Sequence, residues 1–277
     1  MESGRVKNLI IVILLLLDGV LLALVGTRQA RRARSAGAAV RTAVQVLEAH
    51  GLALDEAAMP GEMELAPLEV SRQPESEAEG ARALLGGEPA SEEPGGGVLR
   101  YRGPAGYVQF HGSGEFQAVF EPGAFPLEGQ SPEEHGAEIL RRLGFEARVL
   151  TDGVTDGTGT VTFRQTAPGG VPVLGCQAAL HYADGSLVRI GEARRLMGRP
   201  VRAGGKSAAA DPATVLTGVW HGLESLGAPA RRILSIRAAY ECAVSLSGVA
   251  RLTPVWLVTT DAGEFRLDAA ASAMARV

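Results

Sequence analysis

The chain has 277 residues, of which 27 are lysine or arginine and 31 are aspartate or glutamate, so its formal net charge at pH 7 is −4. Six of the basic and two of the acidic residues lie in residues 1–34, and the remainder carries a formal charge of −8. We do not expect a domain with this acidic balance to bind nucleic acid or an anionic membrane surface. About 240 residues are enough for one sizeable hydrophobic core or two smaller ones.

An apolar run, Leu9–Val25, is the first element of the chain. Fourteen of its seventeen residues are Leu, Ile or Val, and a helix of this length extends about 25 Å, at the short end of what crosses a bilayer. Asp18 opposes insertion by about 2.5–3.5 kcal/mol, which the aliphatic residues outweigh. A cleaved signal peptide is the alternative, but residues 26–34 contain several arginines and no clear cleavage site. We expect an uncleaved, single-pass anchor.

The charges that flank this run leave two orientations open. Arg5 and Lys7 precede it, whereas four arginines follow it within residues 28–34. Counted in this way, the positive-inside rule directs the large domain into the cytoplasm. First helices do not always follow that count, and large domains cross largely regardless of charge. The family resemblance described below favours an extracytoplasmic domain, which is the orientation that we expect.

Asp18 has two interpretations. It is either a tolerated polar residue, protonated or in contact with water, or a contact to a partner helix, because ionisable residues within membranes usually face protein. Gly19, Ala23 and Gly26 form a stripe of small residues on the same helix, which permits the close approach of a second helix. We expect Asp18, Gly19, Ala23 and Gly26 to bind a partner helix in the membrane.

We expect three domains: a cytoplasmic tail, membrane helix and basic flank over residues 1–34, a juxtamembrane helix and first α+β lobe over 35–130, and a second α+β lobe over 131–277. In the first lobe, a helix over residues 35–50 ends at Gly51. An edge strand is predicted over 63–72, where Pro67 lacks an N–H, and a short helix over 75–86. A flexible acidic loop over 86–97 then precedes a β-meander with strands at 98–102, 106–111 and 115–121.

The clearest helix signal opens the second lobe. Ser131 is an N-cap residue, Pro132 occupies the first helical position, and Glu134 completes a capping box. The helix ends at Gly144, and a hairpin turn is predicted at Asp184-Gly185. The strands that follow this helix are predicted at residues 145–150, 159–165, 171–182 and 186–192.

The same plan recurs after residue 210. Asp211-Pro212 begins a helix that Gly227 ends. The strands of this repeat are predicted at residues 232–239, 241–247, 253–259 and 264–268. We therefore expect an α+β fold in which the N-terminal transmembrane helix is followed by two related units, each a helix laid on an antiparallel meander.

Candidate catalytic and metal-binding motifs are weak. The segment GGKS at 204–207 resembles the end of a P-loop, but Pro200 occupies the position of its first glycine. The five histidines are scattered without metal-ligand spacing, and no Gly-x-Ser-x-Gly elbow is present. We therefore expect no enzyme activity, no cofactor and no metal. Active-site residues that the fold brings together from distant segments stay an open alternative.

Cys176 and Cys242 are the two cysteines of the chain. Outside the cytoplasm they can form one disulfide. Each lies in a strand-like run, however, where a free cysteine behaves as a small, buried, apolar residue. The sequence leaves both alternatives open.

The order of these features resembles the YycI/YycH group, which are single-pass regulatory proteins of Gram-positive bacteria. The resemblance rests on a basic start before LLLLDGVLL and on VQVLEAHGLAL at residues 44–54. It continues in VTFRQTAPGGVPVLGCQAALHYADGSLVRIGE at 161–192 and in ARLTPVWLVTTDAGEFRLDAA at 250–270. The segment LTPVWLVTTDAGEFRLDA at 252–269 is also similar to the end of PepSY-like modules, which place a helix on a small antiparallel sheet.

This resemblance implies a function without catalysis at the cell membrane. The extracytoplasmic domain would regulate a sensor histidine kinase of the WalK (YycG) type in cell-wall two-component signalling, through transmembrane-helix and domain contacts. The expected partners are that kinase and a related YycH-like protein in the membrane. The alternative is an extracytoplasmic, PepSY-like module that binds a peptide or ligand and modulates a protease or an envelope enzyme.

Overall fold

The computed structural model describes residues 36–204, 210–245 and 248–277. The predicted membrane segment Leu9–Val25 lies outside these residues, and so do the predicted partner-binding residues Asp18, Gly19, Ala23 and Gly26. Among the described residues, no helix combines the length and the hydropathy that crossing a bilayer requires.

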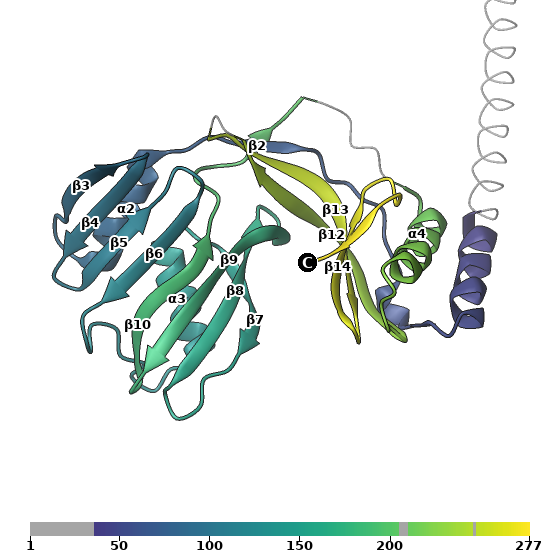
Figure 1. Ribbon diagram of the computed structural model, residues 1–277, viewed down its shortest axis with the longest axis horizontal. Coiled ribbons are helices and arrows are strands. Elements are labelled where there is room, and N and C mark those ends of the chain that lie inside the picture. Colours follow the sequence, from purple (N-terminus) through teal and green to yellow (C-terminus); the bar gives the residue numbers. More distant parts are fainter. Residues whose placement is uncertain (1–35, 205–209, 246–247) are drawn as a thin grey trace, which may run out of the picture.

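The fold is α+β, as predicted, and the described strands join in one continuous fifteen-stranded sheet (Figure 1). The helices are residues 36–49, the short η1 (Glu56–Ala58), α2 (Pro74–Leu85), α3 (Pro132–Arg142) and α4 (Pro212–Ser225). The first eight strands are β1 (Ala53–Leu54), β2 (Leu68–Val70), β3 (Ala90–Gly95), β4 (Val98–Gly103), β5 (Gly106–Phe110), β6 (Glu115–Phe120), β7 (Ala147–Asp152) and β8 (Gly159–Ala167). The others are β9 (Val171–Ala183), β10 (Ser186–Arg194), β11 (Val201–Arg202), β12 (Arg232–Val244), β13 (Ala250–Thr260), β14 (Gly263–Asp268) and β15 (Met274–Arg276).

The three long internal helices begin and end where the sequence predicts. The Ser131 hydroxyl accepts a hydrogen bond from the backbone N–H of Glu134 at the start of α3 (3.2 Å). The Asp211 carboxylate caps α4 in the same way, accepting from the N–H groups of Ala213 and Thr214. Such caps satisfy N–H groups that have no partner within a helix. The predicted helix over 75–86 is α2, which begins at Pro74.

Residues 74–195 form one lobe from two consecutive helix-plus-meander units, and we call it the repeat lobe. The first unit is α2 with β3–β6, and the second is α3 with β7–β10. Their last strands pair antiparallel, with Ala118 opposite Ile190, so the sheet runs β3-β4-β5-β6-β10-β9-β8-β7. Both helices lie on the same face of this sheet (Figure 1). The sequence predicted the second of these units but not the first.

Strand β3 corrects the prediction of a flexible acidic loop over residues 86–97. Its residues pair with β4, Ala90 opposite Arg102 and Glu92 opposite Arg100. The side chain of Glu92 also lies 3.3 Å from Arg102, an ion pair between the two strands. Backbone pairing and this charge pairing hold a segment that has no large apolar residue and is exposed throughout, so its hydropathy does not indicate a strand.

The core of the repeat lobe joins the two units. Its aromatic residues pack in sequence across the sheet, with ring centroids 6.1 Å apart for Phe110 and Phe116 and 6.0 Å apart for Phe116 and Phe145. Helix α3 lies close to the sheet at Gly136, where a Cβ atom would be 2.7 Å from the ring of Phe163. This core draws residues from both sides of position 130, so the domain boundary predicted there falls inside it.

The second lobe, which we call the composite lobe, consists of residues 36–70 and 210–277. Helix α4 and the helix over residues 36–49 pack on β12, β13 and β14 in one core that includes Leu47, Val219 and Trp256. The first helix ends at Gly51, in the left-handed conformation (φ +76°), as predicted. Strand β1 then pairs in parallel with the start of β12.

Two strand predictions in the composite lobe are wrong. The strands predicted over 232–239 and 241–247 are not separate, because β12 continues unbroken from Arg232 to Val244. Glu241 does not interrupt the ladder and makes an ion pair with Arg266 of β14. The predicted edge strand over 63–72 is an inner strand, since β2 pairs with both β11 and β13. Pro67 is compatible with this position because it precedes the first paired residue.

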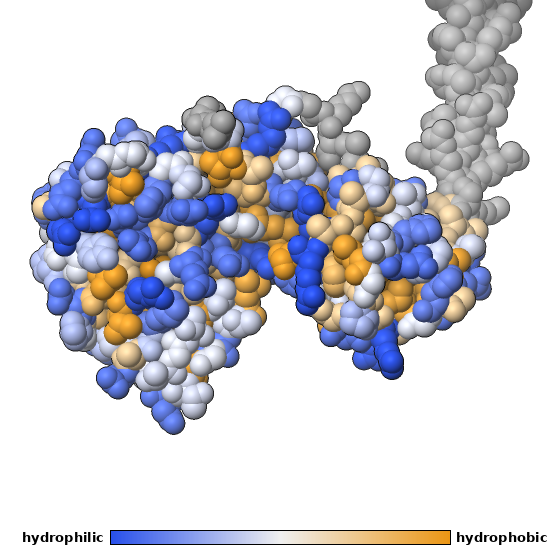
Figure 2. All heavy atoms as spheres, in the orientation of Figure 1, coloured by the Kyte–Doolittle hydropathy of each residue, from blue (hydrophilic) through white to orange (hydrophobic). Residues whose placement is uncertain are grey.

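The two lobes meet at β9, whose first half leaves the repeat lobe and pairs in parallel with β12. The paired residues are Val173 with Tyr240 and Leu174 with Glu241. Cys176 and Cys242 lie here as free thiols that are hydrogen-bonded to each other. That hydrogen bond and burial raise the pKa of Cys176. Figure 2 shows that the molecule is hollowed between the lobes below this junction.

Candidate functional site

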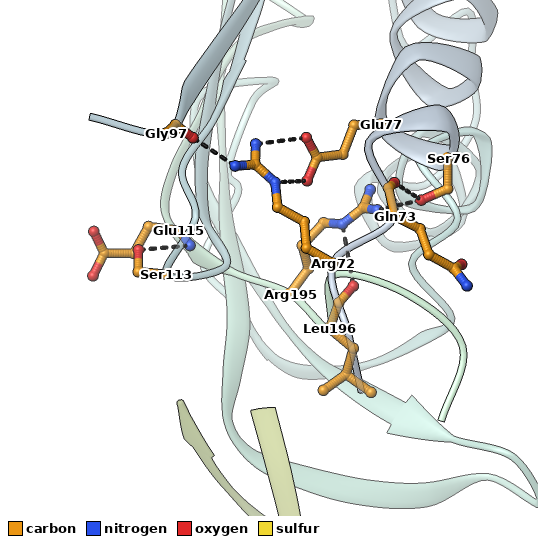
Figure 3. Close-up of polar contacts among 9 residues, drawn as sticks. All are labelled: Arg72, Gln73, Ser76, Glu77, Gly97, Ser113, Glu115, Arg195 and Leu196. Carbon is orange, nitrogen blue, oxygen red and sulfur yellow. Dashed lines mark hydrogen bonds and ion pairs between the residues drawn. The ribbon is translucent and has the colours of Figure 1, made fainter. Parts of the chain in front are cut away.

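A buried ion pair joins Arg72, just before α2, to Glu77 in the first turn of α2 (Figure 3). Arg72 donates two hydrogen bonds to the Glu77 carboxylate, from Nε to Oε1 at 3.0 Å and from Nη2 to Oε2 at 2.8 Å. Its third nitrogen, Nη1, donates to the carbonyl oxygen of Gly97 (2.6 Å). The Glu77 side chain is 1% exposed, and such a buried carboxylate is tolerated only when it is fully paired. The hydrogen bond to Glu77 raises the pKa of Arg72.

Arg195, at the end of β10, is a second buried cation beside this pair. Its Nη1 donates to the carbonyl oxygen of Leu143 (2.6 Å), and its Nε donates to that of Leu196 (3.3 Å). The guanidinium also lies 5.2 Å from the centre of the Phe110 ring, within cation–π range. Burial lowers the pKa of Arg195, and the nearby charge of Glu77 opposes that shift. Arg195 therefore connects the end of α3 to β10 and fixes their separation.

The fixed ends of α2, α3 and β10 surround a groove of about 770 Å³. Five arginines line it: Arg141, Arg142, Arg148, Arg195 and Arg199. We call it the arginine groove. Its acidic lining residues are Glu79 and Glu146, so the groove is positively charged although the chain as a whole is acidic.

Two of the five arginines already have partners. Arg195 is only 6% exposed and is held by carbonyl oxygens, and Arg142 forms an ion pair with Glu138 one turn earlier (2.6 Å). The other three, Arg141, Arg148 and Arg199, are exposed and make no ion pair with any residue in the described ranges. These three guanidinium groups are available to a ligand.

A free sheet edge borders the same groove. The groove lining includes Ala147 and Arg148, at the start of β7, and Glu146, just before it. Within the described part of the chain, β7 pairs with β8 alone, so its other side is an edge of the sheet. Backbone N–H and C=O groups at such an edge can pair with a strand from another chain.

A second groove, of about 550 Å³, lies at the junction of the lobes. Four of its charged side chains form two ion pairs, Arg194 with Glu115 at 2.8 Å and Arg266 with Glu241. Its lining holds three arginines and three glutamates, so this groove lacks the excess of positive charge that the arginine groove has.

The histidines of the described chain have structural partners. The His135 ring lies 3.0 Å from the Tyr182 hydroxyl, and His181 lies 3.0 Å from both Thr160 and Arg189. His50 stacks on the ring of Trp220. Over residues 36–204, 210–245 and 248–277, no three His, Cys, Asp or Glu residues are grouped so that they could hold a metal ion. The P-loop-like segment GGKS lies largely outside these ranges.

Sequence reasoning missed the arginine groove entirely. Its arginines come from α3, β7 and the segment after β10, and no local motif connects them. The local signal was limited to the Arg141-Arg142 pair, which is usual in the last turn of a helix because cations favour that end of the helix dipole.

Comparison with known proteins gives no family for this α+β chain of helix-plus-meander units. No family model matches it, and no curated protein matches it. Among solved structures, an uncharacterized protein from Eubacterium rectale is similar at 11% identity and a TM-score of 0.47, covering 82% of this chain and 91% of that one. The Bacillus megaterium YpeB C-terminal domain is similar at 12% identity and a TM-score of 0.39, covering 75% and 99%. At these scores neither likeness assigns a fold family.

Proposed function

We propose that this chain is a membrane-anchored regulatory protein whose folded part lies outside the cytoplasm and binds other proteins, without catalysis of its own. One observation carries the proposal. Helix 36–49, the first element of the described chain after the predicted membrane segment, has Ala43 and Leu47 buried in the core of the composite lobe. In this proposal, a shift or rotation of the anchor reaches the folded lobe through that helix.

The proposed partner is a sensor histidine kinase of the WalK (YycG) type in cell-wall two-component signalling, together with a YycH-like protein. This part of the proposal rests on the sequence resemblance to the YycI/YycH group. Asp18, Gly19, Ala23 and Gly26 are the proposed contact residues, because a polar residue beside a small-residue stripe favours close helix pairing in a membrane.

Co-purification from detergent tests the membrane contact. The wild-type chain and an Asp18→Leu/Gly19→Leu variant would be expressed with the kinase, and an Ile11→Leu/Val12→Leu variant is the matched control. We expect the first variant to recover about tenfold less kinase, a loss of about 1.4 kcal/mol of association free energy. Equal recovery from all three proteins would remove this helix face from the mechanism.

A reporter enzyme fused after Val277 tests the topology. The proposal expects activity from a reporter that works only outside the cytoplasm, and none from one that works only inside. The opposite result would contradict the extracytoplasmic location and, with it, the kinase-regulator proposal. The test is discriminating because the positive charges after the membrane run are also compatible with a cytoplasmic domain.

The second candidate is a PepSY-like module that binds a peptide or ligand and modulates a protease or an envelope enzyme. The arginine groove beside the β7 edge favours it, because an open edge next to a charged groove suits recognition of an extended segment. Binding of a peptide to the folded part with unchanged kinase co-purification in the Asp18→Leu/Gly19→Leu variant would favour this candidate over the first.

A further inference from the structure

The free charges of the arginine groove call for an anionic ligand. Elsewhere in the repeat lobe, the exposed arginines Arg82 and Arg102 pair with acids, Arg82 with Glu88 (3.1 Å) and Arg102 with Glu92 (3.3 Å). Arg189 contacts His181 instead. Arg141, Arg148 and Arg199 line one groove without such partners in the described ranges. Like charges gathered in a concave site destabilise the fold and attract counter-charge, so the chemistry that fits here is a set of carboxylates or phosphates.

The two outer strands of the repeat lobe differ in what they present at their edges. At one end, β3 has the sequence ASEEPG, is exposed throughout and contains Pro94. Acidic side chains and proline are devices that stop an edge from pairing with another chain. At the other end, β7 has the sequence ARVLTD, without proline, and its residues Val149 and Leu150 are half-buried. The edge beside the arginine groove therefore has less of this protection, with one acidic residue, Asp152, and no proline.

We infer that the arginine groove binds an acidic segment of a partner polypeptide in extended conformation. Its carboxylates pair with Arg141, Arg148 and Arg199, and its backbone adds as a strand to the outer edge of β7. This inference rests on the proposed function, in which the folded part acts by binding other proteins, and it specifies the chemistry of that partner.

The shape of the site favours a polypeptide over a small anion. The three arginines come from separate elements, the end of α3, β7 and the segment after β10, around a groove of about 770 Å³. A single phosphate cannot use such a spread of donors, whereas alternate side chains of one strand can. Guanidinium groups bind carboxylates in a planar, two-hydrogen-bond geometry, which suits glutamate or aspartate on that strand.

Fluorescence anisotropy on the full-length protein in detergent micelles tests the inference. The probe is a fluorescein-labelled heptapeptide of alternating glutamate and valine, and its comparison is the same peptide with glutamine in place of glutamate. We expect the glutamate peptide to bind at least about tenfold more tightly at low salt, and the difference to shrink as salt is added. A glutamate peptide with alternate N-methylated backbone amides should bind about tenfold more weakly, because it cannot complete the strand pairing.

Charge reversal locates the site. An Arg141→Glu/Arg148→Glu/Arg199→Glu variant should lose the preference for the glutamate peptide. The control reverses three exposed arginines of the composite lobe or its border, Arg41→Glu/Arg202→Glu/Arg237→Glu, and has the same net charge. Circular dichroism verifies folding of both, and the three corresponding glutamine substitutions provide a milder variant if the first fails to fold.

Four results would overturn the inference. Equal loss of binding in both charge-reversal variants would mean that net charge and not the groove attracts the peptide. Unchanged binding of the N-methylated peptide would exclude strand addition, and displacement of the probe by millimolar inorganic phosphate would reassign the site to a free anion. Failure of the peptide to bind while the kinase still co-purifies would reject this inference and leave the proposed function standing.

Discussion

The repeat lobe and the composite lobe both place two helices on a sheet, but they obtain the second helix differently. In the repeat lobe, α2 and α3 each begin a unit of the same plan, and residues 74–195 contain all of the helices and strands of the lobe. In the composite lobe, α4 begins one unit and the second helix is supplied by residues 36–49. The repeat lobe is therefore complete in one stretch of chain, whereas the composite lobe forms only when two distant segments meet.

Tryptophan fluorescence separates the two lobes experimentally. The two tryptophans of the chain, Trp220 and Trp256, both belong to the composite lobe. Their emission therefore follows unfolding of that lobe, while far-ultraviolet circular dichroism follows both. If the lobes unfold independently, a substitution in one of them moves only the corresponding transition.

The largest expected effect is that of Glu77→Gln in the repeat lobe. Removal of the buried carboxylate leaves Arg72 with an uncompensated charge, and breaking such a pair costs about 3–5 kcal/mol of the free energy of unfolding. In denaturant titrations, we expect the circular dichroism transition to move to lower denaturant while the tryptophan transition stays in place. Glu79→Gln, on an exposed position of the same helix, is the control. Equal movement of both transitions would show that the lobes unfold as one unit.

Leu47→Ala is the counterpart in the composite lobe. Leu47 is 1% exposed, and truncating a buried leucine costs about 2–5 kcal/mol. Here the tryptophan transition should move to lower denaturant. The part of the circular dichroism change that comes from the repeat lobe should stay in place. Gln45→Ala, on the exposed face of the same helix, should change neither. An unmoved tryptophan transition in Leu47→Ala would contradict a structural role for this helix.

Close helix packing provides a smaller and paired comparison. A Cβ atom at Gly136 of α3 would lie 2.7 Å from the Phe163 ring, and one at Gly222 of α4 would lie 2.5 Å from Met274. Overpacking of this kind costs about 1–3 kcal/mol, so Gly136→Ala should destabilise the repeat lobe and Gly222→Ala the composite lobe. Gly37→Ala, whose Cβ would meet only an ordinary 3.7 Å contact, is the control. Stability gained in either packed variant would refute the close approach.

The smallest expected effect is a dependence on pH that is confined to the repeat lobe. Burial lowers the pKa of His135, while Glu138 and Glu128 act to raise it and Arg142 acts to lower it. Because the unfolded chain takes up this proton more readily, the free energy of unfolding falls as the pH drops below about 6.5. Burial lowers the pKa of His181 in the same direction.

His135→Asn tests this dependence, because the asparagine amide keeps a donor for the Tyr182 hydroxyl, which itself donates to the carbonyl oxygen of Pro132. Unfolding followed by circular dichroism between pH 7.5 and 5 should show a shallower loss of stability in this variant. The tryptophan transition should have the same pH dependence in both proteins. A steeper loss in the variant would reverse the sign of the assigned shift.

The sequence predicted elements with strong local signals. Ser131 before a proline and Asp211 before another identified α3 and α4, and the Asp184-Gly185 turn is present with positive φ at both residues (50° and 72°). The prediction of two units missed the third, because β3 has no large apolar residue and α2 has no side-chain cap. Hydropathy does not report a strand that is held by backbone pairing and ion pairs alone.

The candidate site could not be read from the sequence for a different reason. Arg195 donates a hydrogen bond to the carbonyl oxygen of Leu143, 52 residues earlier in the chain. The other three groove arginines line one groove only because the fold brings α3, β7 and the segment after β10 together. Charge patterns reveal a site when the residues are close in the chain or share a helix face. Here tertiary contacts alone bring the arginines together, whereas the strongest local pattern in the sequence is the apolar run Leu9–Val25.

The pairing of β6 with β10 is an isologous contact, of the kind that joins the two subunits of a twofold dimer. Each unit contributes the same strand, its last, and the two strands run in opposite directions. Such a contact is self-complementary, and a closed pair has no copy of it left for a third member. The unit begun by α4 therefore cannot extend the array in the same way. It attaches through the parallel contact of β9 with β12, and the helix over residues 36–49 packs beside α4 to complete its helix layer.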